Sequence, residues 1–237
     1  MTLFDFSGQR VLVVGGSSGI GLAAAQAFVQ AGARVTIASR NPSKVQAAAE
    51  AIGCTGLVAD ATADRDVASL AAGHEPWEHV VVSAAQTPTG PVRAMSLPDA
   101  HAAMDSKFWG AYRIAKAVPI APSGSLTFIS GFLAVRPNPK MVLQGAINAA
   151  LDALGRGLAL ELAPVRVNTV SPGLIETPLW DRADQSAKAA AFAAARSSLP
   201  IRRVGRPEDV ARAILYLAAT GFATGTTVRV DGGGAIA

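Results

Sequence analysis

Residues 11–21 read VLVVGGSSGIG, and this stretch decides the fold of the chain. Its apolar first half predicts a strand buried on both faces, and the Ala-rich residues that follow predict a helix. Free N–H groups at the start of a helix bind anions, and glycines let a phosphate approach them closely. The stretch therefore predicts a dinucleotide site, and the residues expected at it are Gly15, Ser17, Ser18, Gly19, Ile20 and Gly21.

Short apolar runs alternate with longer, Ala-rich segments along the rest of the chain. The expected strands are 10–14, 34–38, 56–59, 79–83, 125–130, 166–171 and 226–230. The expected helices are 19–31, 42–52, 64–72, 97–117, 143–162 and 207–219. Strands that read as continuous apolar runs are typical of a parallel sheet covered on both faces. We therefore expect an α/β fold, a three-layer doubly wound parallel sheet of the Rossmann type, with residues 1–237 forming a single domain.

The composition excludes several classes of protein. The chain has 237 residues, 50% of them hydrophobic, and a net charge of +4 with no basic stripe, so we expect no nucleic-acid partner. One cysteine, Cys54, rules out an internal disulfide, and three scattered histidines give no metal-ligand spacing. No apolar run reaches the roughly 20 residues of a membrane helix, and no leader-like segment precedes the first strand. We expect no membrane partner, no metal and a cytoplasmic location.

One irregular insertion, residues 174–199, follows a Ser-Pro-Gly and ends in an Ala-rich helical stretch, 185–198. A segment in this place can act as a lid over a substrate site. The alternative is a helical pair packed on the surface.

The spacing Gly-x-x-x-Gly-x-Gly of residues 15–21 resembles the short-chain dehydrogenase/reductase family. Further blocks that are similar to this family are Asp60 after a strand, 166–173 (RVNTVSPG), 203–211 and 230–233. The resemblance implies which residues contact a nicotinamide dinucleotide. They are Asp60 and Ala61 at the adenine, Ser83, Ala84 and Ala85 at the adenine ribose, and Pro172, Gly173, Ile175 and Thr177 at the nicotinamide and pyrophosphate.

Two positions of this cofactor site differ in informative ways. The second strand ends in Ser39-Arg40, where an NAD-selective site would place a carboxylate for the ribose 2′-hydroxyl. The Arg40 guanidinium suits a 2′-phosphate instead, so we expect NADP(H) as the cofactor. Gln86 replaces a glycine of the family pattern and puts a side chain near the phosphates or the pocket mouth.

The catalytic residues that the resemblance implies are absent. Family members use a tyrosine and a lysine four residues apart, a serine, and an asparagine on the preceding helix. Residues 149–163 match the segment after the family's lysine, which places Asn148 at the lysine position and Gln144 at the tyrosine position. Gly131 falls at the serine position and Lys107 at the asparagine position. Tyr112 and Tyr216 are the only tyrosines, and neither has a lysine four residues on.

A different set of polar groups remains at these positions. Gln144 and Asn148 share one face of a helix and can bind ribose hydroxyls or a substrate. Lys107 enters the same cleft from the neighbouring helix, as a proton-exchanging group or as a charged clamp, unless it is an exposed helix residue. Ser130 supplies a hydroxyl, unless it points away.

Two functions fit this pattern, and the intact glycine turn argues against a third, a scaffold that binds no nucleotide. The first is an NADP(H)-dependent oxidoreductase that reduces a small carbonyl or imine, or oxidises the alcohol, with a non-standard proton relay. The second is a catalytically silent NADP(H)-binding sensor or partner subunit. Helices 97–117 and 143–162 carry apolar residues around much of their circumference, and in the resembled family such helices pair across a two-fold axis. We therefore expect a homodimer or homotetramer.

Overall fold

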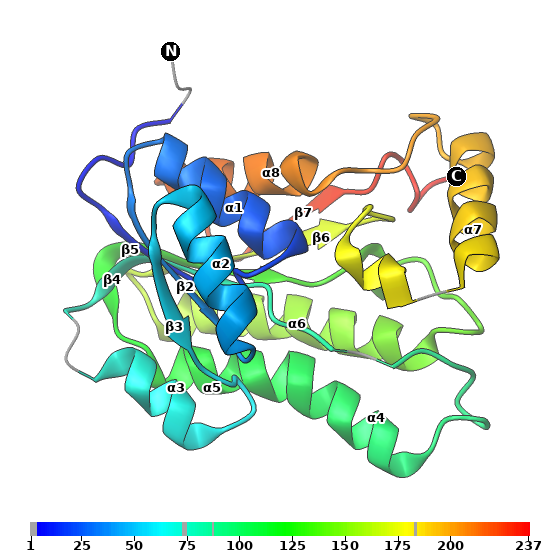
Figure 1. Ribbon diagram of the computed structural model, residues 1–237, viewed down its shortest axis with the longest axis horizontal. Helices are drawn as coiled ribbons and strands as arrows, with labels where there is room; N and C mark the ends of the chain where they lie inside the picture. Colours follow the sequence, from blue (N-terminus) through cyan, green and yellow to red (C-terminus); the bar gives the residue numbers. More distant parts are fainter. Residues whose placement is uncertain (1–3, 73–74, 87, 183) are drawn as a thin grey trace.

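The computed structural model describes residues 4–72, 75–86, 88–182 and 184–237. Its centre is a sheet in the order β3-β2-β1-β4-β5-β6-β7, in which every neighbouring pair is parallel (Figure 1). The strands are β1 (Arg10–Val14), β2 (Arg34–Ser39), β3 (Thr55–Val58), β4 (Trp77–Val82), β5 (Ile120–Ile129), β6 (Arg166–Pro172) and β7 (Thr227–Val230). The expected doubly wound parallel sheet, in a single domain, is confirmed.

Helices form a layer on each face of this sheet (Figure 1). One apolar cluster contains residues of α1 (Gly19–Gln30), α2 (Pro42–Ile52) and α8 (Pro207–Ala219). The cluster on the opposite face contains residues of α3 (Asp64–Ala71), α5 (Gly110–Ala117) and α6 (Val142–Glu161). Alternate residues of β1 contribute to the two clusters, as expected for a strand buried on both faces.

The expected helix 97–117 is wrong in its detail. It is divided into α4 (Leu97–Met104), a π-helical turn η1 (Asp105–Trp109) and α5. A π turn widens the backbone hydrogen bonding to i→i+5, and such turns are frequent at functional sites. The hydrophobic pattern does not predict this π turn, because the residues before and after it have the spacing of an ordinary α-helix. Lys107 lies inside the turn.

Two strands begin earlier than the sequence indicates. β4 begins at Trp77 and β5 at Ile120, where the N–H of Trp77 donates to the carbonyl of Pro119 over 2.9 Å. Trp77 pairs with Ile120 and His79 with Ser125, so Ala121-Pro122-Ser123-Gly124 form an irregularity at which the register shifts. These early starts depend on tertiary contacts, because hydrogen-bond partners come from the neighbouring strand and cannot be predicted from the local sequence.

The insertion 174–199 contains η3 (Pro178–Arg182) and α7 (Gln185–Ser198). Phe192 and Ala195 of α7 form a small apolar cluster with Val204, against which Trp180 packs. The Trp180 and Phe192 rings meet edge to face at 5.4 Å. The insertion is thus packed on itself at one end of the molecule (Figure 1), and its role as a lid stays a prediction.

Candidate functional site

A cavity of about 750 Å³ lies at the carboxyl ends of the central strands. In the sheet, β1 lies between β2 and β4, so the chain winds outward in both directions from this point. Open α/β sheets bind ligands at such a switch point. The cavity is lined by most of the residues expected from the sequence: Gly15, Ser17, Ser18, Gly19, Ile20, Ser39, Arg40, Asp60, Ala61, Ser83, Ala84, Ala85, Lys107, Ser130, Pro172 and Thr177. Gly21, Gln144, Asn148, Gly173 and Ile175 are not among its lining residues.

The glycine turn is shaped to hold a group against the backbone. A Cβ on Gly15 would lie 2.5 Å from the backbone nitrogen of Ala84, and one on Gly21 would lie 2.2 Å from the Gly15 carbonyl oxygen. Gly15 has a φ of +84°, which side chains rarely adopt. Gly21 does not line the cavity but allows the turn to fold tightly beneath it. The residues present therefore fit a dinucleotide whose phosphates approach the N-terminus of α1.

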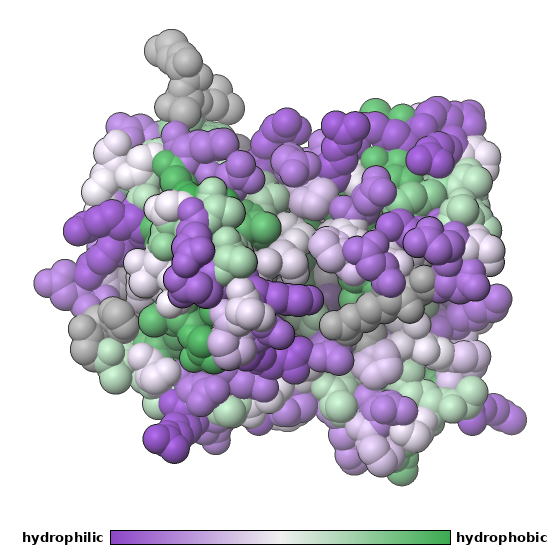
Figure 2. Space-filling view, viewed as in Figure 1, coloured by the Kyte–Doolittle hydropathy of each residue, from purple (hydrophilic) through white to green (hydrophobic). Residues whose placement is uncertain are grey.

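One part of the cavity brings together groups at the ends of β1, β2 and β3. The Ser17 and Ser39 hydroxyls lie 2.8 Å apart. The Asp60 carboxylate accepts hydrogen bonds from the Thr62 N–H and hydroxyl at 2.9 and 2.8 Å, which fixes the loop after β3. Arg40 lines the cavity as expected for a group that recognises a 2′-phosphate. Most of the face in Figure 2 is hydrophilic, with small apolar patches between the polar side chains.

Lys107 lines the cavity, and its ammonium contacts Asn148, which is buried beside the cavity and does not line it. Its ammonium donates to the Asn148 Oδ1 at 2.6 Å and to the Ser130 carbonyl at 2.8 Å. η1 and α6 present these two side chains to each other, although they are 41 residues apart in sequence. The alternative of an exposed helix residue is wrong for Lys107.

Burial lowers the pKa of Lys107 to about 8, and the carboxylate of Asp152 opposes this effect. Burial likewise raises the pKa of Asp152, against the Ser130 and Thr227 hydroxyls and the positive charges of Arg156 and Lys107. Lys107 therefore exchanges its proton near neutral pH more readily than a solvated lysine does. Asp152 lies one helical turn after Asn148 on α6, so both side chains are directed to the same side of the helix.

The comparisons with known proteins agree with this geometry. The family model described as enoyl-(acyl carrier protein) reductase matches residues 14–234. The short-chain dehydrogenase/reductase malC of Malbranchea aurantiaca is 33% identical over 95% of this chain and 94% of its own length. The chain belongs to the short-chain dehydrogenase/reductase family. It is thus an oxidoreductase with a nicotinamide cofactor.

Two solved structures of short-chain dehydrogenases are also similar to this chain. A small-chain dehydrogenase in complex with NADPH has a TM-score of 0.84 and 29% identity, and 97% of this chain and 99% of that chain are covered. An NADPH-bound short-chain oxidoreductase of Pseudomonas aeruginosa, described as containing an atypical catalytic center, has a TM-score of 0.89 and 29% identity, with 97% and 98% covered. Both likenesses extend over nearly the full domain.

Within this short-chain dehydrogenase fold, the position expected to hold tyrosine presents an acceptor. The Gln144 amide N–H₂ donates to the Pro88 carbonyl. A backbone carbonyl only accepts hydrogen bonds, which fixes the orientation of the amide. The Gln144 Oε1 is buried and has no hydrogen-bond partner among the residues that the structure describes. Gln144 therefore carries an unpaired acceptor and no exchangeable proton, and its side chain is buried outside the cavity lining.

The loss of the serine is linked to the asparagine. A Cβ on Gly131 would lie 2.6 Å from the Asn148 Nδ2. Asn148 thus occupies the space that a side chain at position 131 needs. Ser130, the neighbouring hydroxyl, is buried and faces Asp152. The two altered positions form one packed unit with Lys107.

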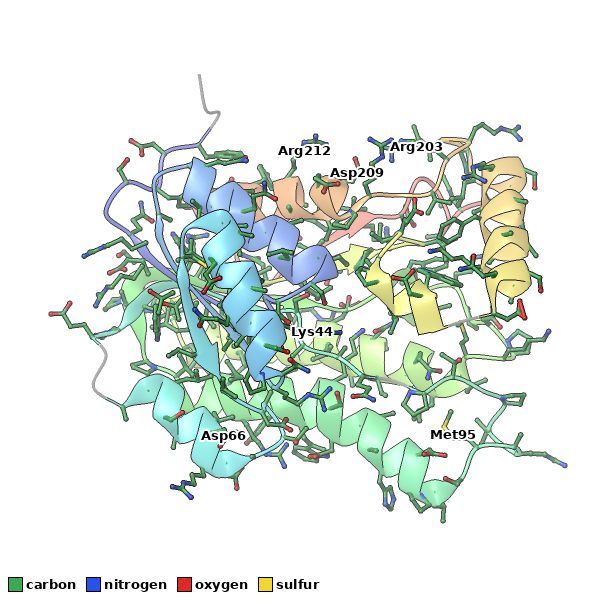
Figure 3. The ribbon with its side chains drawn as sticks, in the orientation of Figure 1. Lys44, Asp66, Met95, Arg203, Asp209 and Arg212 are labelled. Carbon is green, nitrogen blue, oxygen red and sulfur yellow. The ribbon has the colours of Figure 1, made fainter. Side chains whose placement is uncertain are left out.

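Sequence reasoning missed three residues of this site. Asp152 reads as an ordinary polar residue of a long helix, and only its place one turn after Asn148 signals its role. Lys44 lies in the first turn of α2 (Figure 3), and it lines the cavity, as Arg40 does. Nothing in the sequence marks Ser106, yet its hydroxyl accepts a hydrogen bond from the Gln86 N–H at 2.7 Å.

Two exclusions can be stated for the part of the chain that the structure describes. No group of three or more His, Cys, Asp or Glu side chains is placed to hold a metal ion. None of the helices in that part has the length and apolar character to span a membrane.

Proposed function

We propose that this protein is an NADP(H)-dependent oxidoreductase that reduces a small carbonyl or imine, or oxidises the corresponding alcohol, with Lys107 replacing the family's tyrosine and lysine. The single observation that carries the proposal is the contact of the Lys107 ammonium with Asn148 Oδ1 at 2.6 Å. This contact puts a cation of η1 against α6 at the wall of the cavity.

The cofactor preference rests on charge. Arg40 and Lys44 both line the cavity, and Ser39 stands where a carboxylate would favour NAD. A 2′-phosphate would gain charge-assisted hydrogen bonds from Arg40. The chemistry that the nicotinamide supplies when bound is hydride transfer.

The side chains of the protein have to transfer one proton and to stabilise one developing negative charge. When the substrate is a carbonyl, protonated Lys107 stabilises the oxyanion or donates a proton to it. A pKa of about 8 keeps most of the lysine charged at neutral pH while leaving its proton transferable. In the oxidising direction, neutral Lys107 accepts the proton instead.

An imine needs less from the protein. A protonated imine carries its own proton, so it does not require a proton donor from the side chains that line the cavity. A carbonyl does require one. Imines therefore stand beside carbonyls as candidate substrates.

The test is steady-state NADPH oxidation over a panel of matched ketones, aldehydes and cyclic imines. Lys107→Met should lower kcat/KM by roughly 10²–10⁴-fold, the usual value of general acid catalysis. Lys116→Met is the matched control, because Lys116 is an exposed lysine of the adjoining helix α5. Full activity in Lys107→Met would remove this residue from the mechanism.

A second candidate function is a catalytically silent NADP(H)-binding sensor or partner subunit. It is favoured by the amides of Gln144 and Asn148, which cannot exchange protons near neutral pH. Tight NADPH binding by calorimetry with no turnover of any panel substrate would support it over the enzyme.

We also propose a homodimer or homotetramer in the cytoplasm. Trp109 and Tyr112 are 46% and 42% exposed at η1 and α5, and their rings meet edge to face. Leu160 of α6 is 84% exposed. Large exposed side chains on adjoining helices suit a symmetric interface. Sedimentation at micromolar concentration would show a single monomeric species if this proposal is wrong, and fractionation of the source cells tests the location.

A further inference from the structure

Gln86 bridges the mouth of the cofactor cavity. Its Oε1 accepts a hydrogen bond from the Arg40 Nη2 at 2.5 Å, although the residues are 46 positions apart. Arg40 follows β2 and Gln86 follows β4, and β1 lies between these strands in the sheet. The pair therefore crosses over the end of β1, where the glycine turn begins. Both residues line the cavity.

The bridge is held at its Gln86 end. The Gln86 N–H donates to the Ser106 hydroxyl at 2.7 Å, and Ser106 belongs to η1, next to Lys107. The loop after β4 is thus tied to the π turn at this residue. Gln86 presents its carboxamide from a fixed backbone position.

The chemistry of the carboxamide matters for what Arg40 can bind. A neutral amide orients the guanidinium through its oxygen without neutralising its charge. One Arg40 N–H is used in this contact, and the remaining donors of the planar guanidinium stay available to a phosphate. The amide N–H₂ of Gln86 adds two further donors beside them.

We propose that Gln86 is a specificity-determining residue for the cofactor: it positions Arg40 for the 2′-phosphate of NADP(H) while leaving the positive charge of Arg40 free. The inference rests on the proposed NADP(H) preference and adds to it the residue that orients Arg40. A glycine at this position, as in the family pattern, could not form this contact. Lys44, another cation of the cavity lining, has no part in the bridge.

The test separates charge from shape. Gln86→Glu keeps the size and an acceptor for Arg40 but adds a negative charge beside the phosphate position. Gln86→Leu keeps the approximate size and removes the hydrogen bond. Gln26→Glu is the control for net charge, because Gln26 is an exposed residue of α1 outside the cavity lining.

Dissociation constants for NADPH and NADH are measured by calorimetry on the wild type and all three variants. We expect Gln86→Glu to weaken NADPH binding by about tenfold or more, since a like charge is placed beside the phosphate, and to leave NADH binding within about threefold. Gln86→Leu should weaken NADPH binding by a smaller factor, also selectively. Gln26→Glu should change neither.

Two results would overturn the inference, and they are distinguishable. If the wild type prefers NADPH but Gln86→Glu changes both cofactors equally, Gln86 is only part of the cavity wall and the proposed cofactor preference stands. If the wild type binds NADH as tightly as NADPH, the cofactor preference and this inference fail together.

Discussion

Replacement of Lys107 by Met should change how stability depends on pH. Burial lowers the pKa of Lys107 from its ordinary 10.5 to about 8. At about 1.4 kcal/mol per pH unit, this difference of about 2.5 units is worth about 3.5 kcal/mol. Methionine has a similar length, fills the same space and does not titrate, so it removes the proton and keeps the packing.

The sign of the effect follows from the two protonation equilibria. In the unfolded chain Lys107 keeps its proton up to about pH 10.5, whereas in the folded protein it releases the proton near pH 8. Between these values the unfolded state binds more protons, so the free energy of unfolding rises with pH. Below pH 8 both states are protonated and no such slope arises from this group. Lys107→Met lacks the rise altogether.

The assay is urea denaturation of both proteins at several pH values from about 7 to about 10.5. Ionisable groups that do not interact with Lys107, such as Cys54, are the same in both proteins and cancel in the difference. The wild type should gain about 2–3 kcal/mol on Lys107→Met across this window. Curves for the two proteins that stay parallel from pH 7 upward would refute the buried, easily deprotonated lysine. Lys116→Met, at an exposed position, should follow the wild type.

Three further predictions follow from the geometry. Gly131→Ser should lower the free energy of unfolding by about 1–3 kcal/mol, because its Cβ would lie 2.6 Å from the Asn148 Nδ2. Adding Asn148→Ala to this variant should restore most of the lost stability in thermal melting. If it restores none, the side chains at positions 131 and 148 do not compete for the same space. Gly21→Ala should weaken NADPH binding by about tenfold or more in a fluorescence titration, since its Cβ would lie 2.2 Å from the Gly15 carbonyl, and unchanged binding would show that the turn can relax. Burial lowers the pKa of His79 from its ordinary 6.5 to about 4, so between these values the unfolded state binds more protons than the folded state. The free energy of unfolding should therefore fall as the pH is lowered from about 6.5 to about 4, and it should fall less in His79→Asn. Equal slopes of stability against pH in the two proteins would count against a buried neutral imidazole.

Local sequence was sufficient for much of the fold. The strand 10–14 and the helices 42–52, 185–198 and 207–219 have the expected bounds. These segments have strong local signals: a continuous apolar run, Pro at the start of two of the helices, and an Ala-rich composition. The π turn at 105–109 and the early starts of β4 and β5 had no such signal, because the adjoining backbone decides them.

The site divides in the same way. The glycine turn, Arg40 and the missing Tyr-x-x-x-Lys can be read from the chain, because each depends on residue types at fixed spacing. Whether Lys107 reaches Asn148 could not be read, since the contact depends on how η1 packs against α6. Asp152, Ser106 and Lys44 were missed for the same reason.

The sequence by itself determined that the chain is a doubly wound dinucleotide-binding domain without the family's catalytic tyrosine and lysine. Those properties depend on hydrophobic pattern, glycine spacing and residue identity, which are local. The tertiary structure alone decided that Lys107 of η1 contacts Asn148 at the position of the family's lysine, and that Arg40 is bridged to Gln86. The physical reason is that hydrogen-bond partners and burial, which set the pKa of Lys107 and the direction of Arg40, are contributed by segments more than 40 residues apart that only the order of the sheet brings together.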